Sequence, residues 1–227
     1  MLKPLLKRLL GRMPLRLLGP RKLVLCYHDV SAPGSVGHTP FMSTTPALFR
    51  QQLQAFSGVA DFVSLDDVLH RSTTGRWLVA ITFDDGFRSV GTTAWPILQE
   101  LGIPAAVFVN KLAAERNFLP AMADYKIRTE EAWAAVAQQL GYRSPYEEAG
   151  ATYQAHAGVD ALLDHVDAFE QAGLLQQRIY APTQELRGWH QQGLALASHS
   201  ADHRLLAAHP PEAQHASIME NKRWLEE

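Results

Sequence analysis

The feature that most constrains the fold is the run Trp77–Phe83 (WLVAITF), which is almost continuously apolar and leads directly into Asp84, Asp85 and Gly86. A strand without polar alternation is covered on both faces, as strands of a parallel sheet between helices are. Helical patterns separate this run from further predicted strands at Leu23–Tyr27, 61–63, Pro104–Val109 and Leu194–Ser198. This alternation predicts an α/β fold with a parallel sheet.

Helix starts are marked by capping residues and prolines. Thr45 precedes Pro46, which suits a first helical turn because the missing N–H has no partner there. Ser64 is a capping residue for the short helix LDDVLHR. Pro211 opens a last helix that runs to the end of the chain, and Pro96 is expected to kink its helix or to move its start.

The alternation of strands and helices stops between Asn110 and Tyr180. This segment has helical stretches but no apolar strand. We therefore predict a helical insertion over about 111–180, within a single domain that spans 23–227.

Composition excludes several classes of protein. A chain of 227 residues, 47% of them hydrophobic, can bury a substantial core as one domain. Its one cysteine, Cys26, cannot close an intramolecular disulfide, so a disulfide scaffold is excluded. The formal net charge is −2, but seven of the 21 basic residues precede the first acidic residue, Asp29. The rest of the chain is acidic and has no basic stripe, which argues against nucleic acid as a partner.

Residues 1–22 form a basic, leucine-rich leader. No apolar run in it approaches the roughly 20 residues of a transmembrane helix, and it lacks the apolar core and cleavage site of a secretory signal. We expect a peripheral contact with anionic lipid head groups through this leader, the alternative being a solvated segment without a partner. The expected location is cytoplasmic or peripheral to the membrane.

Two polar clusters follow predicted strands. Asp84 and Asp85 come directly after the central strand, where α/β sheets collect their ligands, although an Asp-Gly turn with solvated acids is the alternative. His199 and His203 follow the last strand, and their spacing of four residues predicts that both imidazoles lie on one face of a helical turn. Two histidines and a carboxylate are a common set of ligands for a divalent metal that keeps open positions.

At these residues the sequence resembles a known family. TFDDG at Thr82–Gly86 and H-S-x-x-H at His199–His203 are similar to the first two motifs of the polysaccharide deacetylases, which form carbohydrate esterase family four and are also called NodB homology domains. The resemblance extends to LVLCYHDV at Leu23–Val30 and to WPILQELGIPAAVFV at Trp95–Val109. It implies a distorted (β/α)7-type barrel and a hydrolase that removes acetyl groups, N- or O-linked, from a polysaccharide or oligosaccharide.

The resemblance also implies roles for individual residues. Asp85, His199 and His203 match the metal ligands of the family, and Asp84 matches the base that activates a metal-bound water. The expected cofactor is a divalent metal ion, zinc by its ligand type, and the expected partner is an acetylated carbohydrate.

Further residues are candidates for lining the pocket. His28 and Asp29 end the first strand near the barrel mouth, with a plain polar pair as the alternative. Ser200 lacks a base partner, so we expect it to support the pocket or a turn rather than to act as a nucleophile. Aromatic residues of the insertion could stack on sugar rings or form the core of its helices, namely Tyr125, Trp133 and Tyr142.

The third, fourth and fifth motifs of the family, the last of which supplies the catalytic acid, have no counterpart before Glu227. His209 and His215 are expected in a loop and a helix and do not take that role. We therefore expect the N-terminal portion of a deacetylase domain, truncated before its later motifs, with a barrel that is incomplete at the C-terminus. Two alternatives stay open: an inactive protein that binds metal or sugar, and a magnesium phosphohydrolase.

Overall fold

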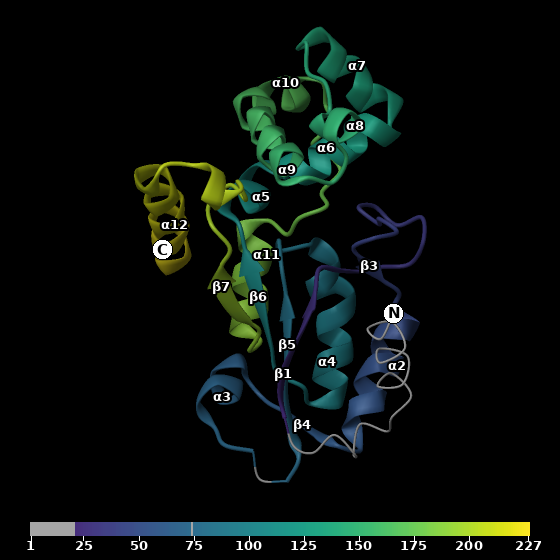
Figure 1. Ribbon diagram of the computed structural model, residues 1–227. Helices are drawn as coiled ribbons and strands as arrows, with labels where there is room; N and C mark the ends of the chain where they lie inside the picture. The colour runs from purple at the N-terminus through teal and green to yellow at the C-terminus, as the bar shows by residue number, and fades with distance from the viewer. Residues whose placement is uncertain (1–20, 74) are drawn as a thin grey trace, which may run out of the picture.

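The computed structural model describes residues 21–73 and 75–227 (Figure 1). The predicted leader therefore lies outside the described residues, apart from its last two positions. The main sheet has five parallel strands: β1 (Lys22–Tyr27), β4 (Ala60–Phe62), β5 (Trp77–Phe83), β6 (Ala105–Val109) and β7 (Ala195–Ser198). A separate two-stranded sheet joins β2 (Asp29–Val30) and β3 (Ser43–Thr44).

Strand β5 is the centre of the main sheet. Every residue of β1 pairs with β5, from Lys22 opposite Leu78 to Tyr27 opposite Phe83. On the other side β4 pairs with the first half of β5 and β6 with the second half, and β7 follows β6. All seven residues of β5 are buried, as its apolar sequence predicts. The α/β class is confirmed, and over the described residues the sheet is open, without a strand that joins β7 to β1.

Helices cover both faces of the sheet. The helices outside the insertion are α2 (Pro46–Ser57), α3 (Leu65–His70), α4 (Trp95–Leu101), α11 (Thr183–Gln191) and α12 (Pro211–Glu226), with a 3₁₀ turn η4 (Leu206–Ala208). Helices α2, α4 and α11 contribute Phe49, Leu98 and Leu186 to the main core. Helix α3 packs on the other face, where Val68 contacts Leu78 and its neighbours. The predicted caps are confirmed, since the hydroxyls of Thr45 and Ser64 accept the backbone N–H of Leu48 and Asp67.

The proline in α4 has the predicted effect. The helix begins at Trp95, after a π-helical turn, η2 (Val90–Ala94), because Pro96 lacks the N–H that a continuous helix would need. Gly91 in this turn leaves room for the indole of Trp189, which would lie 1.8 Å from a Cβ at that position. The turn thereby lets α11 pack closely.

The segment predicted as an insertion consists of helices and the turns that connect them, and none of the named strands lies in it. It comprises α5 (Lys111–Arg116), α6 (Pro120–Thr129), α7 (Glu131–Gln139), α8 (Pro145–Ala149), α9 (Tyr153–Gly158), η3 (Val159–His165) and α10 (Val166–Gln171). Phe118, Trp133, Leu162 and Phe169 form a second core, whereas Ala113, Leu119 and Met122 of the same segment belong to the core of the sheet. Figure 1 shows helices α6–α10 above the carboxyl ends of the strands.

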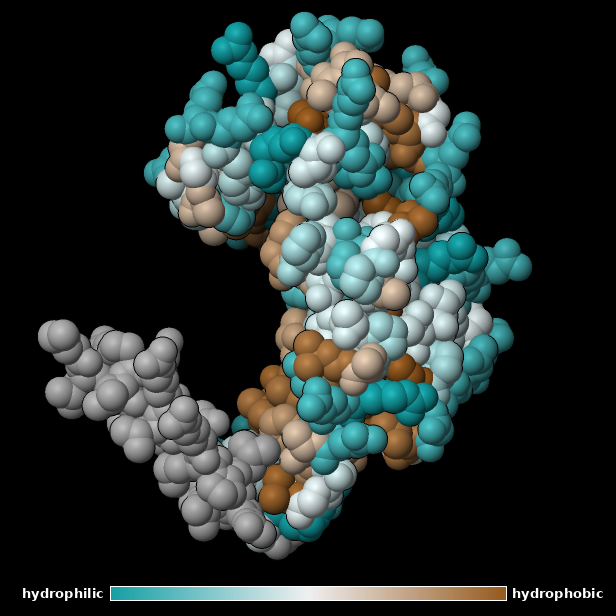
Figure 2. Space-filling model, turned by 90° about the vertical axis from the view of Figure 1, so that its right-hand side faces the viewer, coloured by the Kyte–Doolittle hydropathy of each residue, from teal (hydrophilic) through white to brown (hydrophobic). Residues whose placement is uncertain are grey.

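The surface reflects this division. In Figure 2 many hydrophobic residues lie over the strand-bearing half and along its junction with the insertion, whereas the outer surface of the insertion is largely hydrophilic. Among the helices of residues 21–73 and 75–227, none combines the length and the apolar character needed to cross a membrane.

Candidate metal centre

The turn after β5 presents one carboxylate to the end of the sheet. The backbone N–H of Asp84 donates to the carbonyl of Tyr27 at 2.9 Å, which continues the pairing of β5 with β1. The chain then turns sharply, because Asp85 and Gly86 both have φ of 69°. A Cβ at Gly86 would lie 3.1 Å from Val109, so glycine suits this position for its conformation and its space. The turn buries Asp85, which is 4% exposed.

The segment after β7 carries both histidines, but the prediction of a helical turn is wrong. His199 extends the pairing, since its N–H donates to the carbonyl of Val109 at 3.0 Å. Ser200 and His203 then have φ of 67° and 58°, in the left-handed region, so residues 199–203 form a loop. The two imidazoles converge because the loop folds back on itself, and the spacing of four residues alone would not have revealed this.

This loop is fixed by hydrogen bonds from buried polar side chains. The sequence alone did not indicate these side chains. Nδ2 of Asn110, a residue with no exposed surface, donates to the carbonyls of His199 and Ser200. On α12 the hydroxyl of Ser217 accepts the N–H of Ala201 at 3.2 Å and donates to the carboxylate of Asp202 at 2.8 Å. A polar residue directly after an apolar strand was the available clue for Asn110.

Asn221 adds a second attachment. Its amide donates to the carbonyl of Val109 and to the hydroxyl of Ser198, at 2.8 and 2.9 Å, and its oxygen accepts the N–H of Lys111 at 2.8 Å. The end of β7 is therefore joined to β6 and α12 by a fully buried amide. Nothing in the sequence near Asn221 distinguishes it from an ordinary polar position of a helix.

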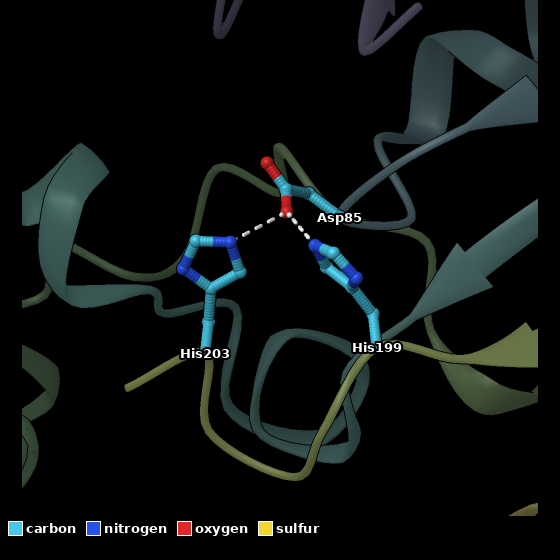
Figure 3. Close-up of side chains that lie close together, drawn as sticks. All are labelled: Asp85, His199 and His203. Atoms are coloured by element: carbon cyan, nitrogen blue, oxygen red, sulfur yellow. Dashed lines mark ion pairs between the residues drawn. The ribbon is translucent and has the colours of Figure 1, made fainter. Parts of the chain in front are cut away.

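Asp85, His199 and His203 meet at the carboxyl end of the sheet (Figure 3). Oδ1 of Asp85 lies 3.5 Å from Nε2 of His199 and 3.1 Å from Nε2 of His203. One donor atom from each residue lies within 4.8 Å of the other two. Oδ1 is buried and makes no hydrogen bond of acceptable geometry. A buried carboxylate oxygen without such a bond, faced by two imidazole nitrogens, fits a divalent cation.

Burial and charge act in opposite directions on these groups. Burial would raise the pKa of Asp85, but contact with His203 and the charges of the nearby imidazoles outweigh it and lower that pKa. Burial would lower the pKa of His203, but Asp85 outweighs it and raises that pKa. For His199 burial prevails, and its pKa is lowered. The Asp85 carboxylate is thus ionised. A protonated His203 and a metal ion would compete for it.

Asp84 lies beside the three residues rather than among them. Its Oδ2 accepts a hydrogen bond from Sγ of Cys26 at 3.2 Å, and its side chain is half-buried. Burial and the neighbouring Asp84 raise the pKa of the Cys26 thiol to about 11, so the thiol keeps its proton and remains the donor. Cys26 entered the sequence analysis only as evidence against disulfides.

The three predicted pocket residues have different surroundings. His28 lines the same cavity as Asp85 and His203. Asp29 is turned away from them, buried, and accepts hydrogen bonds from the hydroxyls of Ser31 and Ser89. Ser200 lines a cavity beside His199 and occupies one of the two left-handed positions of the loop.

Two adjoining cavities lie between the sheet and the insertion. The first, which we call the Asp85 cavity, has a volume of 640 Å³ and is lined by Asp85, His203, His28 and residues of α6, α8 and α9. The second, the His199 cavity, has a volume of 630 Å³ and is lined by His199, by the loop that carries His203 and by residues of α9 and α12. Both volumes are in the range of small-molecule sites. The candidate metal centre is therefore accessible from either cavity.

An open parallel sheet whose carboxyl edge carries a candidate metal site places the chain among α/β proteins with a ligand site at the strand ends. Comparison with known families is more specific, since the family model described as polysaccharide deacetylase matches residues 71–227. This is more than half of the chain, which therefore belongs to the polysaccharide deacetylase family. Members of this family are hydrolases that act on acetyl groups of carbohydrates.

One solved structure supports the fold, and two further ones match part of the chain. The deacetylase PplD of Streptococcus pyogenes, solved in complex with acetate, has a TM-score of 0.52 at 17% identity over 91% of this chain and 67% of that protein. IcaB from Ammonifex degensii has 26% identity and a TM-score of 0.37 over 48% of this chain and 49% of that one. A de-N-acetylase from Aggregatibacter actinomycetemcomitans has 23% identity and a TM-score of 0.34, over 42% and 40%. The chain thus spans half or less of the length of the last two. A search of curated proteins finds no match.

Proposed function

We propose that this protein removes acetyl groups from a carbohydrate, with a divalent metal ion held by Asp85, His199 and His203 and with Asp84 as the base. The observation that carries the proposal is the buried Oδ1 of Asp85, which lacks a hydrogen bond of acceptable geometry while two imidazole nitrogens face it. Membership of the polysaccharide deacetylase family supports the reaction.

Zinc is the metal that we propose for this site. Two imidazoles and one carboxylate are typical of catalytic zinc sites that leave a position open, whereas magnesium prefers oxygen ligands. The donor atoms come from two strand ends that β6 separates, and the buried amides of Asn110 and Asn221 fix the loop that carries the histidines. Such outer contacts orient ligands and support metal affinity.

The chemistry is divided between the metal and the protein. A bound divalent ion would polarise the acetyl carbonyl and acidify a water molecule. Asp84 directly precedes the proposed ligand Asp85 in the sequence but is not one of the converging donors, so its carboxylate is available to accept a proton from the attacking water. The protonated thiol of Cys26 orients this carboxylate through its hydrogen bond to Oδ2.

The departing amine or alkoxide needs a proton. Two imidazoles line the Asp85 cavity besides His203, namely His28 after β1 and His156 on α9. Nδ1 of His156 lies 2.7 Å from the carbonyl oxygen of Thr152, so this nitrogen donates, and Nε2 can give a proton to the leaving group only when the ring is cationic. His28 and His156 are the candidate proton donors, and separate alanine variants compare them. The donor's loss is expected to lower kcat by about 10²–10⁴-fold.

Adjacent isosteric variants provide the main test. Asp85→Asn is expected to lose both bound zinc and acetate release, whereas Asp84→Asn is expected to keep one equivalent of zinc and lose about 10²–10⁴-fold in turnover. Zinc is measured by elemental analysis after gel filtration, and acetate is measured with N- and O-acetylated oligosaccharides. Retention of zinc by Asp85→Asn would exclude the proposed ligand set, and full activity of Asp84→Asn would exclude the base.

A further inference from the structure

The helical insertion forms the wall of the Asp85 cavity opposite the metal centre. This wall contains Tyr125 and Arg128 of α6, Tyr146 of α8 and His156 of α9. The ring of Tyr146 packs edge-on against His156, with centroids 5.2 Å apart, and the ring of Tyr125 packs edge-on against Phe41, with centroids 5.1 Å apart. Aromatic rings that line a cavity offer flat faces to the apolar side of a sugar ring.

Arg128 is held in a fixed orientation within this wall. Its Nε donates to Oδ2 of Asp124 at 2.9 Å, and Asp124 is fully buried, with its other oxygen accepting the hydroxyl of Tyr142 at 2.8 Å. The guanidinium carbon lies 5.1 Å from the ring centroid of Tyr146 and 6.0 Å from that of Tyr125. Asp124 thus orients the guanidinium group between two aromatic rings.

The two terminal nitrogens of this guanidinium group, Nη1 and Nη2, are available to a ligand. Within residues 21–73 and 75–227, neither Nη1 nor Nη2 of Arg128 makes a hydrogen bond, and the side chain is 31% exposed at the cavity. A planar pair of N–H donors matches two oxygens of a carboxylate or phosphate, whereas a neutral hydroxyl accepts only one of them. Ordering of the group in advance lowers the entropic cost of binding.

We propose that Arg128 selects an acidic acetylated saccharide, one that carries a carboxylate or phosphate group. This inference rests on the proposed function, because the acetyl group of the same molecule must reach the metal centre. Arg128 places a positive charge on the side of the cavity formed by the insertion, and this charge attracts an anionic group of the substrate. The acidic group therefore binds to the insertion while the acetyl group lies against the sheet.

The test must keep the buried Asp124 satisfied. The double variant Asp124→Asn/Arg128→Gln replaces the ion pair by an amide pair and removes the unused guanidinium edge, and Arg128→Lys keeps the charge but removes the planar fork. The matched control is Arg143→Gln, which removes an exposed arginine of the same insertion that does not line the cavity. Thermal melts of all variants verify that they fold.

Binding is measured by calorimetry on the zinc-loaded chain with Asp84→Asn as background, which keeps the substrate intact. The ligands are an oligosaccharide of alternating N-acetylglucosamine and glucuronic acid, its carboxyl-reduced form, and an N-acetylglucosamine oligomer with a phosphate group. The glucuronic acid oligosaccharide and the phosphate-bearing oligomer distinguish a carboxylate from a phosphate as the source of negative charge. The carboxyl-reduced form is the neutral reference.

We expect at least one acidic ligand to bind about tenfold more tightly than the reduced form, and the double variant to abolish this preference. Arg128→Lys is expected to retain part of the preference, and Arg143→Gln all of it. Equal affinity for acidic and neutral ligands, or an undiminished preference in the double variant, would overturn the inference. Tight binding of an acidic ligand without acetate release by the Asp84-containing chain would instead contradict the proposed function alone.

Discussion

The sheet and the helical insertion contribute different chemistry to one cavity. The sheet supplies the proposed metal ligands and the proposed base, all of which lie directly after a strand end or in the loop that follows one. The insertion supplies rings and a guanidinium group that can recognise a substrate. The reacting groups are therefore tied to the backbone of a hydrogen-bonded sheet, whereas the recognition groups project from short helices.

The two parts also differ in how their side chains are held. Around the metal centre, buried amides join three separate segments, as Asn110 and Asn221 show. In the insertion, a separate apolar core around Trp133 and Phe169 sets the positions of the helices. The geometry of the candidate metal site therefore depends on buried hydrogen bonds and the positions of the insertion helices on packing, so we expect core substitutions in the insertion to affect the two differently.

The largest expected effect is that of Trp133→Ala in the core of the insertion. The indole stacks on Phe169 with centroids 5.1 Å apart and is 5% exposed, so its loss is expected to cost about 3–5 kcal/mol. We expect the insertion to unfold first, in a separate transition, while zinc affinity stays within about threefold. Urea unfolding followed by fluorescence and a zinc titration measure both quantities.

Trp77→Ala is the matched control, since it removes a buried indole from the core of the sheet. It should lower the stability of the sheet and the binding of zinc together. If Trp133→Ala instead weakens zinc binding as much as it weakens folding, the two parts are one cooperative unit, and the comparison fails.

Asn110→Ala tests the hydrogen bonds of the metal loop. Loss of the amide frees the carbonyls of His199 and Ser200 and leaves the two left-handed positions unsupported, so zinc affinity is expected to fall by about 10–100-fold. Competition with a chromogenic chelator measures it.

Asn117→Ala is the control in the insertion. Asn117 is also buried, and it bonds to the backbone of Leu175, Gln177, Ile179 and Tyr180. Its variant should lose stability but keep zinc affinity. Equal zinc affinities in the two variants would show that Asn110 acts on the fold alone.

The features that the sequence could predict are those that depend on local pattern. Strand β5, the caps at Thr45 and Ser64 and the helical nature of the insertion were predictable because each depends on local pattern. The convergence of Asp85 with the two histidines was predictable from their place at strand ends and from the resemblance to the deacetylases.

Long-range contacts were not predictable from the sequence. The loop conformation at His203 depends on Asn110, which lies some ninety positions earlier in the chain. Asp29 follows β1 like His28 but is drawn away by two serine hydroxyls, one of them in Ser89. Of the three aromatic residues considered for sugar stacking, Trp133 packs in the core, Tyr142 bonds to Asp124, and only Tyr125 lines the Asp85 cavity.

A smaller effect is expected from Asp202, whose pKa is shifted in the folded protein. Burial would raise the pKa of Asp202, but hydrogen bonds from Arg204 and Ser217 outweigh it and lower it. A lowered pKa in the folded state adds stability above the unfolded value of about 3.9, and this stability is lost as the pH falls through the folded value. Unfolding free energies of Asp202→Asn should therefore decline less than those of the wild type below about pH 4.

Ser217→Ala, which removes one of the two partners, should give an intermediate pH dependence in the same urea titrations. Parallel curves for wild type and Asp202→Asn would mean that this carboxylate contributes nothing to acid sensitivity.

The smallest expected effects come from surface ion pairs, and they differ between the two parts. In the insertion Arg116 joins α5 to α10 through two carboxylates, Asp167 at 2.5 Å and Glu170 at 2.6 Å. Because this arginine is 35% exposed, Arg116→Gln is expected to cost at most about 1 kcal/mol, less at 0.5 M salt. Arg50→Gln removes the exposed pair with Glu100 between α2 and α4, which are already fixed by the main core, and should leave unfolding unchanged. If both variants behave alike in urea unfolding, the helices of the insertion are held by their apolar core as firmly as those of the sheet, and charge adds nothing to their arrangement.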